Sequence, residues 1–109
     1  MNSIINIDNM HIIQHNVRNY CTNKELLHSD WDNEDADIIM LNSTCINPKY
    51  NHTINYRDYK VHTTPSSFHN GSAILVKRQL KHSRTKTGDD QLVAVTIGTT
   101  GGLITLATF

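Results

Sequence analysis

Five basic residues gather in a short stretch of the second half of the chain, where they are candidates for binding a polyanion. They are Lys77, Arg78, Lys81, Arg84 and Lys86. Side chains of this kind contact nucleic acid phosphates whatever the base sequence. They also serve as ordinary solvated charges on edges and loops, and no Phe, Tyr or Trp stands among them to stack on bases. The stretch leaves both interpretations open.

Histidine and cysteine are the other residue types that could hold a metal. None of the histidines stands at a His-Glu-x-x-His or another zinc-ligand spacing, and no cysteine pair accompanies them. Cys21 and Cys45 are the only cysteines, and no secretory signal precedes them, so we expect reduced, partly buried thiols. A specific zinc site is therefore not expected. The seven histidines are His11, His15, His28, His52, His62, His69 and His82.

Composition places the chain among soluble, intracellular proteins, in the nucleus or the cytoplasm. At 109 residues it is one domain or part of one. Its apolar runs do not exceed four residues, whereas a membrane-spanning helix needs about 18. Residues 1–40 carry seven acidic and two basic residues, and residues 41–109 carry eight basic and three acidic ones. The basic half is the part suited to facing phosphates.

The first half predicts a β-α-β unit. Residues 10–17 have the length and composition of a strand. Thr22 and Glu25 fit a helix capping box, and Leu27 and Trp31 would share one face of that helix. The apolar run at 38–41 is typical of a strand buried on both faces.

The second half predicts strands alone. Residues 43–56 are rich in Asn and contain Pro48, which favours a loop. Short strands are expected at 59–62, 71–76, 91–98 and 103–109, with a turn at 99–102. The apolar content of the last strand suggests a core position. A β-α-β opening followed by hairpins indicates a layered α/β or α+β sandwich.

Four segments resemble, in order, the endonuclease/exonuclease/phosphatase superfamily. Residues 14–18 are similar to its Q-W-N-V-R opening, and residues 37–44 to its D-I-I-x-L-Q-E-T. Residues 71–77 resemble G-G-x-A-I-L-V-K, and the last two strands resemble those before its Y-x-P-P. Residues 23–27 are similar to the endonuclease domains of non-LTR retrotransposons, which nick target DNA.

The resemblance implies a partial four-layer αββα sandwich with mixed and antiparallel sheets, and residues 1–109 as the truncated N-terminal part of that domain. It also implies Mg²⁺, which prefers oxygen ligands that include a carboxylate. The superfamily's metal-binding Glu corresponds to Ser43, and its amide beside the metal to Asn16. Gln14 matches a further catalytic position. Asn16 and Gln14 are either an inherited site or ordinary polar ends of a strand.

These implications predict a remnant of a metal-dependent DNA endonuclease that is inactive alone and binds Mg²⁺ only weakly. Ser43 supplies no anionic charge, and the resemblance places the catalytic base in a later half. We expect weak DNA binding, no membrane association, and self-association through an exposed strand edge. The alternatives are a non-cleaving nucleic-acid-binding module and a gene-model fragment without selected function.

Overall fold

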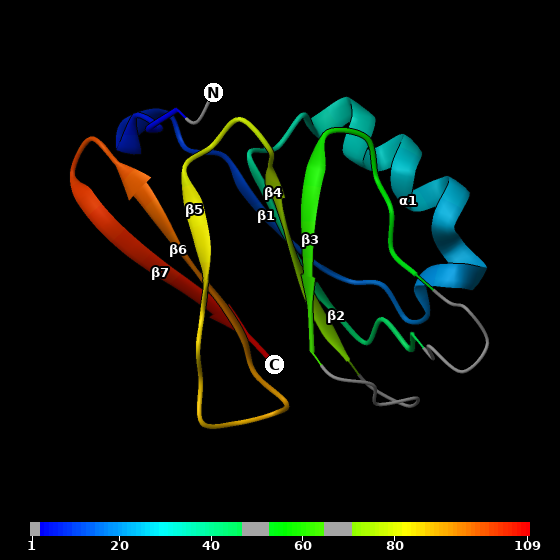
Figure 1. Cartoon of the computed structure of the whole chain (residues 1–109). Coiled ribbons are helices and arrows are strands. Elements are labelled where there is room, and N and C mark those ends of the chain that lie inside the picture. Colours follow the sequence, from blue (N-terminus) through cyan, green and yellow to red (C-terminus); the bar gives the residue numbers. More distant parts are fainter. Residues whose placement is uncertain (1–2, 47–52, 65–70) are drawn as a thin grey trace.

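The chain folds as one helix and two sheets, seen in a computed structural model that describes residues 3–46, 53–64 and 71–109. The helix, α1, covers one face of the first sheet, and the second sheet packs on the other face (Figure 1). The expected mixed α/β class is confirmed. Part of the predicted loop, residues 47–52 with Pro48, lies outside the described residues, as do His52 and His69.

The first sheet has the strand order β1-β2-β4-β3. Its strands are β1 (Ile12–Asn16), β2 (Ile38–Asn42), β4 (Ser72–Lys77) and β3 (Tyr59–Thr63). β1 and β2 are parallel because α1 carries the chain back between them, and the other pairs are antiparallel. Helix and second sheet cover the two faces, which explains why β2 and β4 read as continuous apolar runs.

Helix α1 spans Tyr20–Glu34 and begins before the predicted cap. Asn19, not Thr22, is the N-cap, and its side chain accepts a hydrogen bond from the Thr22 N–H at 3.3 Å. The capping-box assignment was therefore wrong, because Thr22 already lies in the first turn. The expected shared face is confirmed, since Leu27 and Trp31 are both buried. No helix of the described residues is long and apolar enough to cross a membrane.

The second sheet is antiparallel, with the order β5-β6-β7. Its strands are β5 (His82–Thr85), β6 (Val93–Thr99) and β7 (Gly102–Thr108). β5 was not predicted, because its four residues are polar or charged. It exists through its pairing with β6, where His82 faces Ile97 and Arg84 faces Val95. Two residues of the basic stretch, Lys77 and Arg84, therefore lie within strands.

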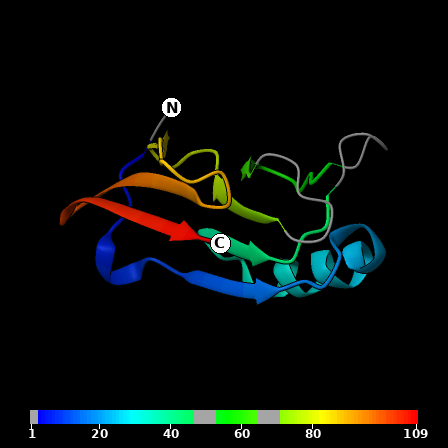
Figure 2. The ribbon, with the colours of Figure 1, turned by 90° about the horizontal axis from the view of Figure 1, so that it is seen from below.

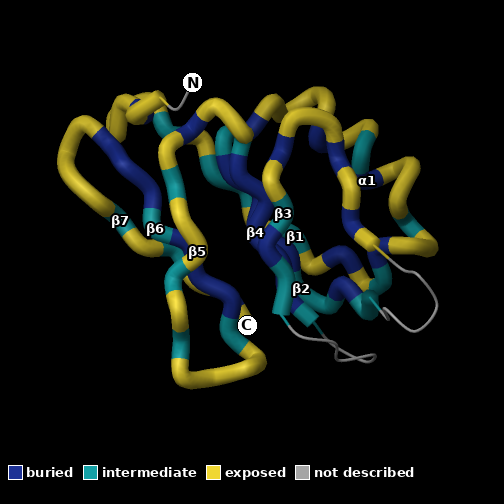
Figure 3. The backbone as a smooth tube through the Cα atoms, viewed as in Figure 1, coloured by how far each residue is buried: buried dark blue, intermediate teal, exposed yellow. Residues whose placement is uncertain are grey.

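Two apolar clusters fill the molecule, and Figure 3 shows the buried backbone running through β2, β4 and β6. One lies between α1 and the first sheet and the other lies between the sheets. The last strand is a core strand on one face alone. Ile104, Leu106 and Thr108 face inward, whereas Leu103 is 76% exposed. Self-association through this strand stays a prediction.

Candidate functional site

The polar residues of β1 and β2 meet at the ends of these parallel strands. Pairing places Gln14 opposite Met40 and Asn16 opposite Asn42. Side chains alternate along a strand, and Ile12, Ile38 and Met40 belong to the cluster between the sheets. Gln14, Asn16 and Asn42 therefore face the same side, toward the second sheet. Sequence reasoning placed Gln14 and Asn16 in one site, and the structure brings them together.

Asn42 connects the ends of β1 and β2 to the second sheet. Its Oδ1 accepts a hydrogen bond from Gln14 Nε2 at 3.1 Å, and its Nδ2 donates to Thr108 Oγ1 at 2.8 Å. The same Nδ2 also donates to the backbone oxygen of Phe109. The end of β7 therefore lies beside the end of β2, as Figure 2 shows. The Nδ2 end of the Asn42 amide thus joins the two sheets, and its Oδ1 end is held by Gln14 of the neighbouring strand.

The chain leaves both strands in an unusual backbone conformation. Directly after β1, Arg18 and Asn19 have φ of 53° and 107°, and after β2, Ser43 and Cys45 have φ of 56° and 52°. Residues with a Cβ rarely adopt positive φ, at a cost on the order of 1–3 kcal/mol each. Such conformations persist only where the surroundings hold them, so this edge is rigidly built.

Backbone hydrogen bonds join the two segments and supply that support. The N–H groups of Val17, Asn19 and Tyr20 donate to the carbonyl oxygens of Asn42, Ser43 and Thr44 at 3.0, 2.9 and 3.0 Å. The start of α1 is thereby fixed beside Ser43. Ser43 thus lies directly after β2, beside Asn42 and the N-cap of the helix, and its metal-binding role stays a prediction.

The donor set at this edge does not fit a tightly held Mg²⁺. Gln14, Asn16, Asn42 and Ser43 are all neutral, and the two polar atoms of the Asn42 amide already have protein partners. Mg²⁺ sites in proteins rely on at least one carboxylate. Within residues 3–46, 53–64 and 71–109, no three His, Cys, Asp or Glu side chains gather as a metal-binding group.

The five predicted basic residues do not form one surface. Lys77 ends β4 and lies 3.0 Å from Asp35 Oδ1 and 3.8 Å from Asp37 Oδ1, at the end of the sheet remote from Asn42. Arg84 extends from β5 and is exposed. Arg78, Lys81 and Lys86 are also exposed and lie in the connections on either side of β5. Lys77 is thus set apart from the others by its carboxylate partners.

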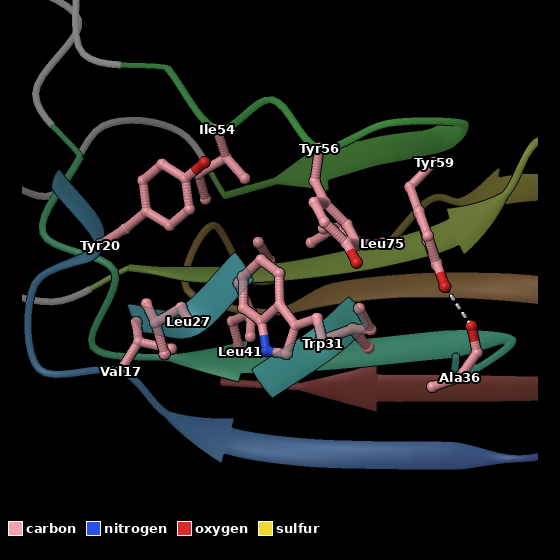
Figure 4. Packing of buried hydrophobic residues seen from close by; sticks show 12 residues of the cluster. Val17, Tyr20, Leu27, Trp31, Ala36, Leu41, Ile54, Tyr56, Tyr59 and Leu75 are labelled. Carbon is pink, nitrogen blue, oxygen red and sulfur yellow. Dashed lines mark hydrogen bonds between the residues drawn. The ribbon is translucent and has the colours of Figure 1, made fainter. Parts of the chain in front are cut away.

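Aromatic residues of the apolar cluster beneath α1 carry a second set of polar groups (Figure 4). Tyr20 Oη lies 2.8 Å from His28 Nε2, and the Tyr59 hydroxyl donates to the Ala36 carbonyl. Burial raises the pKa of Tyr59 to about 12, and Asp35 and Asp37 add to the effect. These hydroxyls stay protonated at neutral pH and act as fixed donors. The cluster therefore stabilises the helix on the sheet.

Sequence reasoning missed two contacts between the sheets. One is the Thr108 end of the Asn42 bond, and the other is a contact between His62 and His82, whose Nε2 atoms lie 3.0 Å apart. Strand alternation could have placed Thr108 on the inward face with Leu106.

The two thiols form no disulfide, but Cys21 is exposed, so the expectation that both are partly buried was wrong for this residue.

The fold has a counterpart among solved structures. The chain is similar to the "Endonuclease domain of TRAS1, a telomere-specific non-LTR retrotransposon", with a TM-score of 0.72 and 17% sequence identity. The match covers 92% of this chain and 45% of that domain. A scan against protein-family models found no match, and neither did a search of curated proteins.

This likeness defines the class of fold. Over most of its length, the chain has the α+β architecture of a retrotransposon endonuclease domain. The resemblance expected from four short segments is therefore confirmed at the level of the fold.

Proposed function

We propose that the chain is a remnant of a metal-dependent DNA endonuclease domain of a non-LTR retrotransposon and that these 109 residues do not cleave DNA by themselves. The observation that carries the proposal is the neutral donor set at the ends of β1 and β2. Hydrolysis through a bound divalent ion needs an anionic oxygen ligand to hold the ion. Ser43 offers a hydroxyl where the resemblance expects a carboxylate.

A second candidate function is nucleic acid binding without cleavage. It is favoured by Arg84, Lys86, Lys81 and Arg78, which are exposed on and around β5. Binding through such residues is weak, independent of base sequence and strongly weakened by salt. Lys77 contributes little to this surface, because Asp35 and Asp37 already neutralise it.

The decisive test restores the missing charge. Ser43→Glu adds a carboxylate, and Ser43→Gln is the matched control, because it has the same length and meets the same positive φ without the charge. We expect Mg²⁺ affinity, measured by calorimetry, to rise at least about tenfold for Ser43→Glu relative to Ser43→Gln, or ~1.4 kcal/mol. We expect neither variant nor the original chain to nick supercoiled plasmid in Mg²⁺ or Mn²⁺.

Cleavage by the unaltered chain would contradict the proposal. The diagnostic result is open-circle DNA that disappears with a chelator and with Asn16→Ala. Nicking by Ser43→Glu alone would show that Ser43 accounts for the lost activity and that this chain holds the rest of the machinery.

A further inference from the structure

His62 and His82 make a polar contact between the edge strands of the two sheets. His62 lies on β3 opposite Ile74, and His82 lies on β5 opposite Ile97. Ile74 and Ile97 both belong to the cluster between the sheets, so both rings point inward. Their Nε2 atoms are 3.0 Å apart and the rings meet edge to face at 89°.

The hydrogen bonds fix where the protons of this pair reside. His82 Nδ1 lies 2.9 Å from the Leu80 carbonyl oxygen, which can only accept, so Nδ1 carries the proton. In neutral His82 the Nε2 atom is then an acceptor, and the Nε2–H of His62 donates to it. The contact needs one proton between the two Nε2 atoms. A second proton would place two N–H groups face to face and break the bond.

The surroundings do not compensate an added charge. Lys60 lies two residues before His62 on the same face of β3, and Arg84 lies two residues after His82 on the same face of β5. From β4 and β6 the pair faces apolar side chains, namely Ile74, Val76, Val95 and Ile97. Burial lowers the pKa of His62 to about 4, and the neighbouring His82, Arg84 and Lys60 add to the effect.

We propose that His62 and His82 form an acid-labile latch that holds β5 against β3 at neutral pH and releases it when the pair takes up a proton. The direction follows from linkage. His62 binds a proton near its ordinary pKa of 6.5 when exposed, but only near 4 in the closed form. The latch is complete above about pH 6.5 and weakens as pH falls toward 4.

The release is directed toward one side of the sandwich. β5 has four paired residues and bonds to β6 alone within the described sheet, whereas β6 and β7 share seven pairs. The Asn42 contact on the far side has no group that titrates in this range. Proton uptake therefore loosens β5 and uncovers Ile74 and Val76, while β2 and β7 stay joined.

The test is a comparison of urea unfolding from pH 7.5 to pH 4.5 for the full chain and two variants. His62→Gln keeps an amide N–H to donate to His82 but does not titrate. His11→Gln is the control, because His11 is an exposed histidine that lies outside the interface between the sheets. The unfolding constant of the original chain, divided by that of His62→Gln, should rise by up to about tenfold per pH unit between 6.5 and 4.5. The unfolding constant of the original chain, divided by that of His11→Gln, should not rise in this way over the same pH range.

Histidine resonances in NMR provide a readout that needs no variant. We expect His62 to titrate well below 6.5, with the amide signals of β3 and β5 changing together with it and those of β2 and β7 following only at lower pH. Titration of His62 near 6.5 with unchanged β5 amides would overturn the latch, and so would a flat ratio of unfolding constants.

Discussion

On one side of the sandwich, Asn42 of β2 donates to Thr108 at the end of β7 and to Phe109 just after it, whereas on the opposite side His62 of β3 meets His82 of β5. Both contacts lie at the rim of the same apolar cluster and join the same two sheets. The amide contact keeps its donors and acceptors at any ordinary pH. The imidazole contact depends on how many protons the two rings hold. One fold thus has a side that is indifferent to acid and a side that responds to it.

The comparison also shows where a polar contact is costly to change. A typical hydrogen bond stabilises a folded protein by only about 0.5–1.5 kcal/mol, but a buried donor or acceptor left without a partner costs about 1–3 kcal/mol. Substitutions that leave one partner unpaired should therefore lower stability more than substitutions that remove both partners.

The largest effect is expected from Asn42→Asp, which would make the indifferent side respond to pH. A carboxylate cannot donate to Phe109 O and places negative charge against it. We expect a loss of about 2–3 kcal/mol in unfolding free energy at pH 7. Burial and the facing oxygen raise the pKa of the new carboxyl, so stability should return as pH falls through that pKa, the opposite sign to His62.

Asn16→Asp is the matched control, because Asn16 lies opposite Asn42 in the sheet but is exposed. Urea unfolding at pH 7 and pH 4.5 would measure both. Equal losses for the two substitutions would mean that Asn42 does not join the sheets in the way described.

A smaller effect is expected on the histidine side, where one and two substitutions should differ. His82→Leu removes the acceptor of His62 and leaves its N–H without a partner, which costs about 1–3 kcal/mol at pH 7. The double variant His62→Leu/His82→Leu replaces both groups with apolar ones and should come within about 1 kcal/mol of the original chain, without the acid-dependent loss. Additive losses in thermal or urea unfolding would contradict the latch geometry.

The parts of the fold that sequence predicted are those whose signal is local. The apolar runs of β2 and β4 predict strands because both of their faces are covered. β5 has no such run, since its strand character comes from pairing with β6. The helix start was misplaced because Asn19 caps α1 with a φ of 107°, a conformation that no residue pattern announces.

The site was predictable only as far as motifs reach. Resemblance singled out Gln14, Asn16 and Ser43, and their role as a site stays a prediction. The contacts between the sheets join residues 66 and 20 positions apart. Such pairs depend on how the sheets pack, which spacing along one chain does not encode.

The smallest expected effect concerns DNA and distinguishes the two sides by function. If the exposed basic residues around β5 contact phosphates, Arg84→Ala should weaken DNA binding roughly two- to fivefold at low salt. It should also reduce the slope of the logarithm of the binding constant against the logarithm of salt concentration by about one. Lys77→Ala is the control and should change little, since Asp35 and Asp37 hold Lys77. Fluorescence anisotropy with a labelled duplex measures both.

The pH dependence of that binding tests whether the responsive side is also the binding side. A phosphate near Arg84 would favour the protonated form of the neighbouring His62, so binding there would take up a proton and strengthen as pH falls from about 6.5 toward 4.5. The His62→Gln variant should lose this dependence. Equal binding by Arg84→Ala and the original chain, or affinity independent of salt, would leave these residues as solvated charges and confine the role of this side to the latch.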